Sequence, residues 1–195
     1  EEIDFAIESG ADLLMLPMFQ HEEEVREFSD LVKGRVGIVP LVETYSATKT
    51  IDKIVKIPSI AEVYIGLNDL HLDMQMKFMF EPLANGLVDT MAETIRKSEV
   101  PFGFGGIARV GEGVIPGELV LAEHLRLGSS SVILSRTFHR QDDNESIAVA
   151  NLDLKVELEN LNEAAQRLKT RDCSQIAIDS QHLKNLVADV VKAKN

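Results

Sequence analysis

The sequence lacks the features of a secreted or membrane-spanning protein. Its single cysteine, Cys173, cannot form an internal disulfide and agrees with a reducing compartment. No apolar run approaches the roughly 20 residues that a bilayer span needs. The acidic opening, residues 1–4, has the wrong charge for a secretory signal. We therefore expect a cytoplasmic protein that makes no membrane contact.

Basic residues are scarce as well. The chain has 20 Lys and Arg against 32 Asp and Glu, a net charge of -12, and no long basic cluster. Nucleic acid binding draws much of its free energy from neutralising phosphates, so we expect no nucleic acid partner. A hydrophobic share of 45% with 27% charged residues is typical of a globular protein. Small anionic substrates stay possible, because a metal or a few backbone amides can set the field inside a pocket.

Residues 1–140 alternate amphipathic helices with short apolar strands, which predicts an α/β fold with a parallel sheet of βα units. The first strand contains an unbroken apolar run, Leu13–Leu16, typical of a strand covered on both faces. Ser46 is the expected N-cap of the third helix. The predicted strands are residues 11–17, 36–42, 62–65, 100–104 and 131–134. The predicted helices are residues 3–9, 22–32, 46–56, 82–98 and 117–127.

The length of this region fits only part of a (β/α)8 TIM-type barrel. A complete barrel averages roughly 250 residues, so residues 1–140 have room for about five βα units. We therefore expect an incomplete barrel whose earlier strands precede this sequence. Residues 141–195 form a predicted second domain, a helical extension with helices at 152–168 and 180–192 after a polar linker at 141–146. The apolar sides of these helices pack either across the barrel or on another subunit of a homo-oligomer.

Two acidic residues stand where apolar strands end. Glu43 directly follows one strand, and Asp69 comes shortly after the next. The carboxyl ends of parallel barrel strands meet at one mouth, where two carboxylates could share Mg²⁺ or Mn²⁺. The alternative is that Glu43 caps the following helix and Asp69 forms a turn with Asn68.

Two segments around these acids carry a family resemblance. The first is Leu-Val-Glu-Thr at residues 41–44, and the second runs from residue 57 to 70 and ends in Gly-Leu-Asn-Asp-Leu. Their sequences and spacing resemble the paired signature of the HpcH/HpaI aldolase and citrate lyase β family, within the superfamily of phosphoenolpyruvate/pyruvate-type barrels. The similarity covers roughly residues 3 to 138.

The resemblance implies a divalent-metal-dependent carbon-carbon lyase of the class II aldolase type. It implies that Glu43 and Asp69 are the metal ligands. It also implies that the enzyme acts on a 2-oxo acid such as pyruvate plus an aldehyde. It also implies that the turn containing Gly66, Leu67 and Asn68 binds the substrate carboxylate. The arginine and acid-base histidine of the family lie on strands outside this chain, so no catalytic residue is assigned.

The sequence departs from the family at two places beside the site. Leu41 stands where many members have glutamine, and Leu67 stands where a proline is more usual. Two alternative functions therefore stay open. One is a CoA-thioester lyase of the citrate lyase β or malyl-CoA type, which should show more basic residues than this segment offers. The other is a non-catalytic barrel subunit with a binding or scaffolding role.

Three further segments have weaker signals. The glycine-rich stretch 103–111 is predicted to be a strand-end loop that lines the mouth, with substrate contact or phosphate binding as alternatives. Arg109 is predicted to be an exposed loop arginine, with an anion-binding role as the alternative. His71 is predicted to lie on a surface loop. The methionines and phenylalanines of residues 74–80 predict a subunit contact or a lid.

Overall fold

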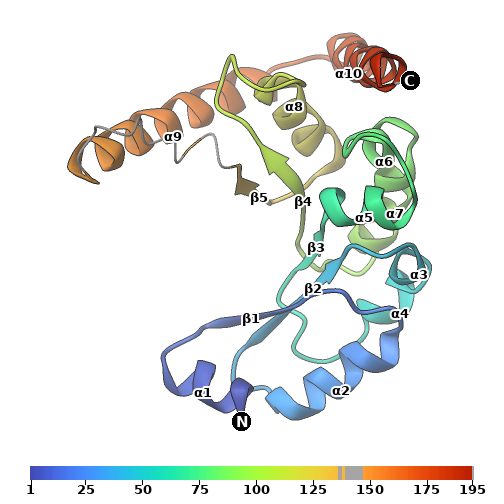
Figure 1. Ribbon diagram of the computed structural model, residues 1–195, viewed down its shortest axis with the longest axis vertical. Helices are drawn as coiled ribbons and strands as arrows, with labels where there is room; N and C mark the ends of the chain where they lie inside the picture. The colour runs from blue at the N-terminus through green and yellow to red at the C-terminus, as the bar shows by residue number, and fades with distance from the viewer. Residues whose placement is uncertain (136–137, 139–146, 195) are drawn as a thin grey trace. The chain divides into compact units, whose positions relative to one another are not determined.

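The computed structural model describes residues 1–135, 138 and 147–194, with side chains described from residue 154 onward in the last segment. These residues form two compact units. The first comprises residues 1–105 and 129–131, and the second comprises residues 106–128 with the remaining C-terminal part. Figure 1 follows the chain from its N-terminus to its C-terminal helix.

The five strands are hydrogen-bonded in the order in which they occur along the chain. The first four pair in parallel, with Leu13 opposite Gly37, Leu41 opposite Tyr64 and Val63 opposite Phe102. This parallel arrangement of βα units confirms the predicted α/β class and matches part of a TIM-type barrel. The strands are β1 (Leu13–Leu16), β2 (Gly37–Val42), β3 (Val63–Ile65), β4 (Phe102–Ile107) and β5 (Ser131–Leu134).

Helices and strands of the first unit together supply its buried core. Side chains from α2, β2, β3 and α5 are fully buried, and each contributes about 1.5–3 kcal/mol through loss of apolar surface from water. The fully buried side chains include Val25, Val32, Ile38, Val42, Val63, Ile65, Leu67 and Leu70. The helices of this unit are α1 (Glu2–Glu8), α2 (Glu22–Val32), α3 (Tyr45–Thr48), α4 (Ile51–Ile54), α5 (Leu67–Asp73), α6 (Glu81–Ala84) and α7 (Leu87–Arg96).

Strand β1 is covered less than its sequence predicts. Leu13 and Met15 leave 53% and 44% of their surfaces exposed, so the prediction of cover on both faces is wrong. In the described part of the chain β1 is the last strand of the sheet and pairs with β2 alone. Its apolar run therefore has one open face.

The predicted helix 46–56 is two short helices, α3 and α4. Thr44, not Ser46, is the N-cap of α3, because its hydroxyl accepts a 3.2 Å hydrogen bond from the amide of Ala47. The amides of Lys49 and Thr50 donate to carbonyls three residues back. These tighter bonds end α3 after one turn.

The predicted helix 82–98 is also divided, into α6 and α7. Gly86 separates them with a φ of 88°, a left-handed conformation that interrupts the helix. The phenylalanines before α6 belong to the core rather than to a lid. Phe78 and Phe80 are each 8% exposed, and their rings pack edge to face with centroids 5.5 Å apart.

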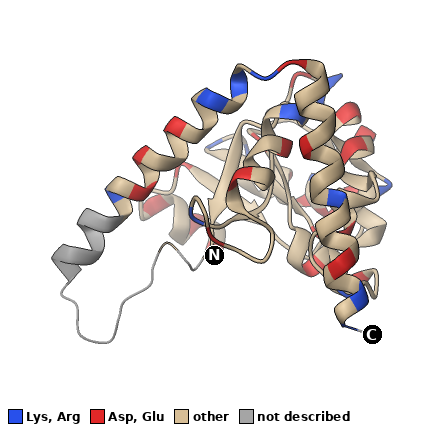
Figure 2. Cartoon of the chain, turned by 90° about the horizontal axis from the view of Figure 1, so that it is seen from above, with Lys and Arg blue, Asp and Glu red and all other residues tan. Residues whose placement is uncertain are grey.

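The second unit contains α8 (Gly117–Leu127), α9 (Ile147–Lys169) and α10 (Cys173–Ala193). Both α9 and α10 contact α8. Helix α8 has the predicted bounds and ends at Gly128, whose φ is 77°. Helices α9 and α10 are longer than predicted. Figure 2 shows acidic and basic residues interspersed along the long C-terminal helices.

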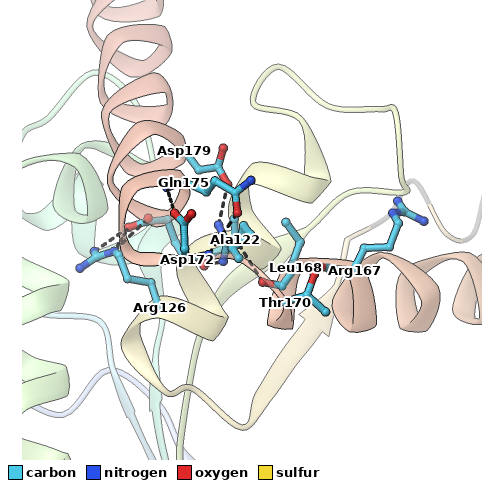
Figure 3. Close-up of polar contacts among 10 residues, drawn as sticks. Ala122, Arg126, Arg167, Leu168, Thr170, Asp172, Gln175 and Asp179 are labelled. Carbon is cyan, nitrogen blue, oxygen red and sulfur yellow. Dashed lines mark hydrogen bonds and ion pairs between the residues drawn. The ribbon is translucent and has the colours of Figure 1, made fainter.

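The joint between α9 and α10 is held by polar contacts. Asp172 caps α10 by accepting from the amide of Gln175, and the Gln175 side chain accepts in return from the amide of Asp172 (Figure 3). The half-buried guanidinium of Arg171 donates to the carbonyls of Leu168 and Ala122, and it pairs with Asp179 on α10 as well. Arg171 thus links α8, α9 and α10.

The predicted linker at 141–146 lies outside the described residues, and the division into domains 1–140 and 141–195 stays a prediction. No helix in the described part of the chain combines the length and the apolar character needed to cross a membrane.

Candidate functional site

The predicted metal ligands lie at one edge of the first unit. Strands β1, β2 and β3 run parallel, so the segments after them meet at the same edge. Met18 follows β1, Glu43 follows β2, and Asp69 lies in the first turn of α5 after β3. Sequence reasoning placed the two acids correctly with respect to their strands, although it predicted a turn where α5 begins.

Glu43 is a buried carboxylate with a defined hydrogen bond. Its side chain is 4% exposed, and Oε1 accepts a 2.9 Å bond from the amide of Met18. Met18 has a φ of 56°, a left-handed conformation uncommon for a residue with a Cβ. Because Thr44 caps α3, the alternative that Glu43 serves as the helix cap is wrong.

Thr44 fixes the backbone beside Glu43. Its buried hydroxyl donates a 2.8 Å hydrogen bond to the carbonyl of Phe19 while accepting from Ala47. The segments after β1 and β2 are therefore joined twice, through Thr44 and through the Met18–Glu43 bond. Two bonds from consecutive residues hold the Glu43 carboxylate in one place.

Gly66 lets the end of β3 approach this carboxylate. A Cβ at residue 66 would lie 2.8 Å from Oε2 of Glu43 and 3.2 Å from Cδ1 of Leu41. A larger residue would have to displace one of them. The apolar Leu41 side chain thus occupies the place beside Gly66 where the family more often has glutamine.

The two acids interact electrostatically. Burial raises the pKa of the Glu43 carboxyl, the bond from the Met18 amide opposes this, and the negative charge of Asp69 raises the pKa further. Asp69 itself is exposed on α5. A carboxylate that is both buried and near a like charge becomes more stable when a cation binds beside it.

The predicted substrate-binding residues can act mainly through their backbone. The amide of Gly66 donates to the carbonyl of Val42 at 3.0 Å, so it is already engaged in the sheet. The side chain of Leu67 is fully buried. The amides of Leu67 and Asn68 belong to the first turn of α5, where amides have no partner within the helix. These two amides are the groups that a carboxylate could reach.

Sequence reasoning missed the role of Asp73. Its carboxylate accepts a 2.7 Å hydrogen bond from the amide of Tyr45, which ties α5 to the start of α3. The ammonium of Lys49 lies 3.9 Å from the centroid of the Tyr45 ring. Asp73 lies four residues after Asp69 and thus on the same face of α5. This spacing is the sequence signal for Asp73, but it applies only if residues 67–73 are predicted to be a helix.

The donor set suits a hard divalent cation. In the described residues no cluster of three or more His, Cys, Asp or Glu side chains could hold a metal, so the candidate ligand set is limited to the two carboxylates Glu43 and Asp69. Mg²⁺ is commonly bound by one or two carboxylates and completes its shell with water or substrate oxygens. The Glu43 carboxylate suits such an ion, because it is buried and its charge is repelled by that of Asp69.

Three other predicted features differ from expectation. Strand β4 continues to Ile107, so most of the predicted glycine-rich loop is strand. Arg109 is not an exposed loop residue: its side chain is 12% exposed and lies 3.9 Å from Glu157 on α9. His71 is half-buried on α5, where a ring nitrogen hydrogen-bonds the carbonyl of Asn68.

Sequence comparison finds no matching family model and no matching curated protein. Solved structures do match. RipC from Yersinia pestis has a TM-score of 0.59 at 15% identity, covering 90% of this chain and 72% of RipC. CitE from Mycobacterium tuberculosis, in complex with magnesium and pyruvate, has a TM-score of 0.56 at 13% identity, covering 79% of this chain and 69% of CitE.

An HpcH/HpaI aldolase from Desulfitobacterium hafniense also matches, with a TM-score of 0.50 at 16% identity. The match covers 79% of this chain and 65% of the aldolase, so the chain spans slightly less than two thirds of that protein. Identities this low report on the fold rather than on activity. The chain has the fold of the HpcH/HpaI aldolase and citrate lyase β superfamily.

Proposed function

We propose that the protein is a divalent-metal-dependent carbon-carbon lyase of the class II aldolase type, acting on a 2-oxo acid such as pyruvate plus an aldehyde. One observation carries this proposal: a buried carboxylate, Glu43, lies near a second carboxylate, Asp69, where adjacent parallel strands end. The buried carboxylate of Glu43, with a like charge nearby, is costly to keep ionised without a cation. Mg²⁺ or Mn²⁺ would supply that charge.

Glu43 and Asp69 would hold the metal. When bound, a divalent ion polarises the 2-oxo carbonyl and stabilises the enolate formed as the carbon-carbon bond breaks. The chain's own residues position these ligands. The Met18 amide engages Oε1 of Glu43, and Oε2 faces the end of β3 at Gly66.

Backbone amides would orient the substrate. We assign its carboxylate to the amides of Leu67 and Asn68 at the start of α5, with the backbone of Gly66 beside them. In cleavage of a 4-hydroxy-2-oxo acid, the electron pair of the C3–C4 bond passes to the pyruvate enolate. The C4 hydroxyl loses its proton as the aldehyde forms, and the enolate takes up a proton at C3. No described residue is assigned to these proton transfers.

The neighbouring structures support the chemistry by analogy. CitE from Mycobacterium tuberculosis is known with magnesium and pyruvate, and the citrate lyase beta subunit from the same organism with oxaloacetate and magnesium. Both ligands are 2-oxo acids. The ligands of these neighbouring structures are the reason for testing pyruvate first.

We further propose a homo-oligomer formed through the C-terminal helices. Val156 and Leu158 on α9 are 51% and 37% exposed, and Ile178 on α10 is 63% exposed. A second subunit would remove these side chains from water. Sedimentation of the full chain should then give a mass above the 21.6 kDa monomer.

Activity is tested by following pyruvate release from a 4-hydroxy-2-oxo acid, with the full chain and Mg²⁺. We expect Glu43→Gln and Asp69→Asn to lower the rate by about 100-fold or more, because metal polarisation contributes several kcal/mol. The matched controls are Glu27→Gln and Asp30→Asn, which alter exposed acids on α2 and should keep the wild-type rate. A wild-type rate no higher than that of Mg²⁺ alone would contradict the proposal.

A further inference from the structure

Three exposed apolar side chains lie at the same edge as the two acids. Met18 is 57% exposed, Tyr45 is 44% exposed and Leu72 is 59% exposed. Each belongs to the segment after a different strand, namely β1, β2 and β3, and these strands are neighbours in the sheet. We call these three exposed side chains, which follow three neighbouring strands, the apolar rim.

The structure ties each rim residue to the acids. The amide of Met18 binds the Glu43 carboxylate at 2.9 Å, and Tyr45 lies two residues after Glu43 in the chain. Leu72 shares the exposed side of α5 with Asp69, three residues earlier and thus on the same helix face. The apolar rim therefore lies at the same strand ends as the candidate metal ligands.

The charges at this edge are mainly negative. Glu43, Asp69 and Asp73 contribute three carboxyl groups, and the positive group in described contact with the rim is Lys49, against the Tyr45 ring. With a divalent ion and one substrate carboxylate bound, these groups would have no net positive charge. A second carboxylate or a phosphate on the substrate would meet repulsion from Asp73.

Resting on the function proposed above, we infer that the site takes 2-oxo acids whose chain beyond C3 is neutral and apolar, and that the apolar rim contacts this chain. The corresponding aldehyde is aliphatic or aromatic rather than carboxylated or phosphorylated. Each methylene buried against the rim should strengthen binding about fourfold, from roughly 0.8 kcal/mol per CH₂.

The test compares two ligands of equal length. The full chain with saturating Mn²⁺ is titrated calorimetrically with 2-oxohexanoate, whose tail is apolar, and with 2-oxohexanedioate, whose tail ends in a carboxylate. Pyruvate is titrated separately. We expect 2-oxohexanoate to bind at least tenfold more tightly than 2-oxohexanedioate and more tightly than pyruvate. Equal affinities, or a preference for the dianion, overturn the inference.

Variants of the apolar rim test whether it causes the preference for 2-oxohexanoate over 2-oxohexanedioate. Tyr45→Ala and Leu72→Ala should each reduce the preference for 2-oxohexanoate about threefold to tenfold. Leu31→Ala is the matched control, because Leu31 is a leucine of similar exposure, at 53%, on α2. It should leave the preference unchanged. Loss of preference in Leu31→Ala to the same degree would also overturn the inference.

Two failures are distinguishable. Absence of Mn²⁺-dependent pyruvate binding overturns the proposed function and this inference with it. Pyruvate binding without a preference for the apolar tail overturns the inference alone. If Tyr45→Ala and Leu72→Ala change the sedimenting mass but not the ligand preference, the apolar rim is a subunit contact and the inference is wrong.

Discussion

The amide of Met18 and the carboxylate of Glu43 join residues 25 positions apart in the sequence, at 2.9 Å. This bond crosses from the end of β1 to the end of β2 and sets the direction of a buried acid. It leaves Oε2 of Glu43 facing Gly66 at the end of β3. The three neighbouring strand ends are therefore organised around one carboxylate.

Glu43→Gln should make the metal-free protein relatively more stable as the pH rises. A carboxyl whose pKa is raised on folding holds its proton longer in the folded state, so its contribution to the free energy of unfolding falls as the pH rises from the ordinary value of 4.5 through the raised pKa. Glutamine keeps an acceptor for Met18 but cannot ionise. Urea unfolding in EDTA should show wild type and variant converging near pH 4 and the variant gaining by pH 8. Glu27→Gln should show no such trend, and a pH-independent difference for Glu43→Gln would contradict the pKa shift.

Gly66→Ala should destabilise the fold and weaken metal binding together. The new Cβ would lie 2.8 Å from Oε2 of Glu43, and overpacking of this kind costs about 1–3 kcal/mol. Gly106→Ala is the control, since its nearest atom would be 3.7 Å away. Urea unfolding and Mn²⁺ titration measure both effects. Unchanged stability in Gly66→Ala would mean that Glu43 is free to move.

Thr44→Val should cost about 1–3 kcal/mol of unfolding free energy. Valine keeps the shape but removes a buried hydroxyl that caps α3 and bonds the Phe19 carbonyl, leaving that carbonyl without this donor. The same change at the exposed Thr90 of α7 removes a bond to Gly86 and should cost less than about 0.5 kcal/mol. Equal costs at both positions would refute the structural role assigned to Thr44.

Arg171→Met should loosen the joint between α9 and α10. The half-buried Arg171 side chain binds two carbonyls and Asp179, and leaving these acceptors without their donor should cost about 1–3 kcal/mol. Arg167→Met provides a comparison from the same region, because Arg167 is 65% exposed and pairs at the surface with Glu118. That change should cost no more than about 1 kcal/mol. Chemical unfolding of both variants compares the free energy lost with the Arg171 contacts and that lost with the surface pair of Arg167.

The fold was predictable where local signals agreed. The bounds of α2 and α8 follow from their apolar periodicity and from the glycine that comes shortly after each of them, Gly34 after α2 and Gly128 after α8. The division of helices at Gly86 and after Thr48 was missed, because the apolar spacing continues through both breaks. Periodicity reports which side chains are buried and does not report where the backbone turns.

The candidate site was predictable only in part. Glu43 and Asp69 follow recognisable strands, so their placement at one edge came from the pattern of the sequence. The bond from Met18 to Glu43 could not be predicted, because it uses a backbone amide in a left-handed conformation. Arg109 was predicted to be exposed because its partner, Glu157, lies far along the chain on α9. Long-range pairs of this kind leave no local signal.

The measurement that tests the central claim most directly is a calorimetric titration of Mn²⁺ into the full chain, with and without pyruvate, for wild type, Glu43→Gln and Asp69→Asn. The account predicts that wild type binds one Mn²⁺, that pyruvate strengthens this binding, and that both variants lose it. Mn²⁺ binding that is absent from the wild type, or that persists unchanged in both variants, would contradict the assignment of Glu43 and Asp69 as a metal site.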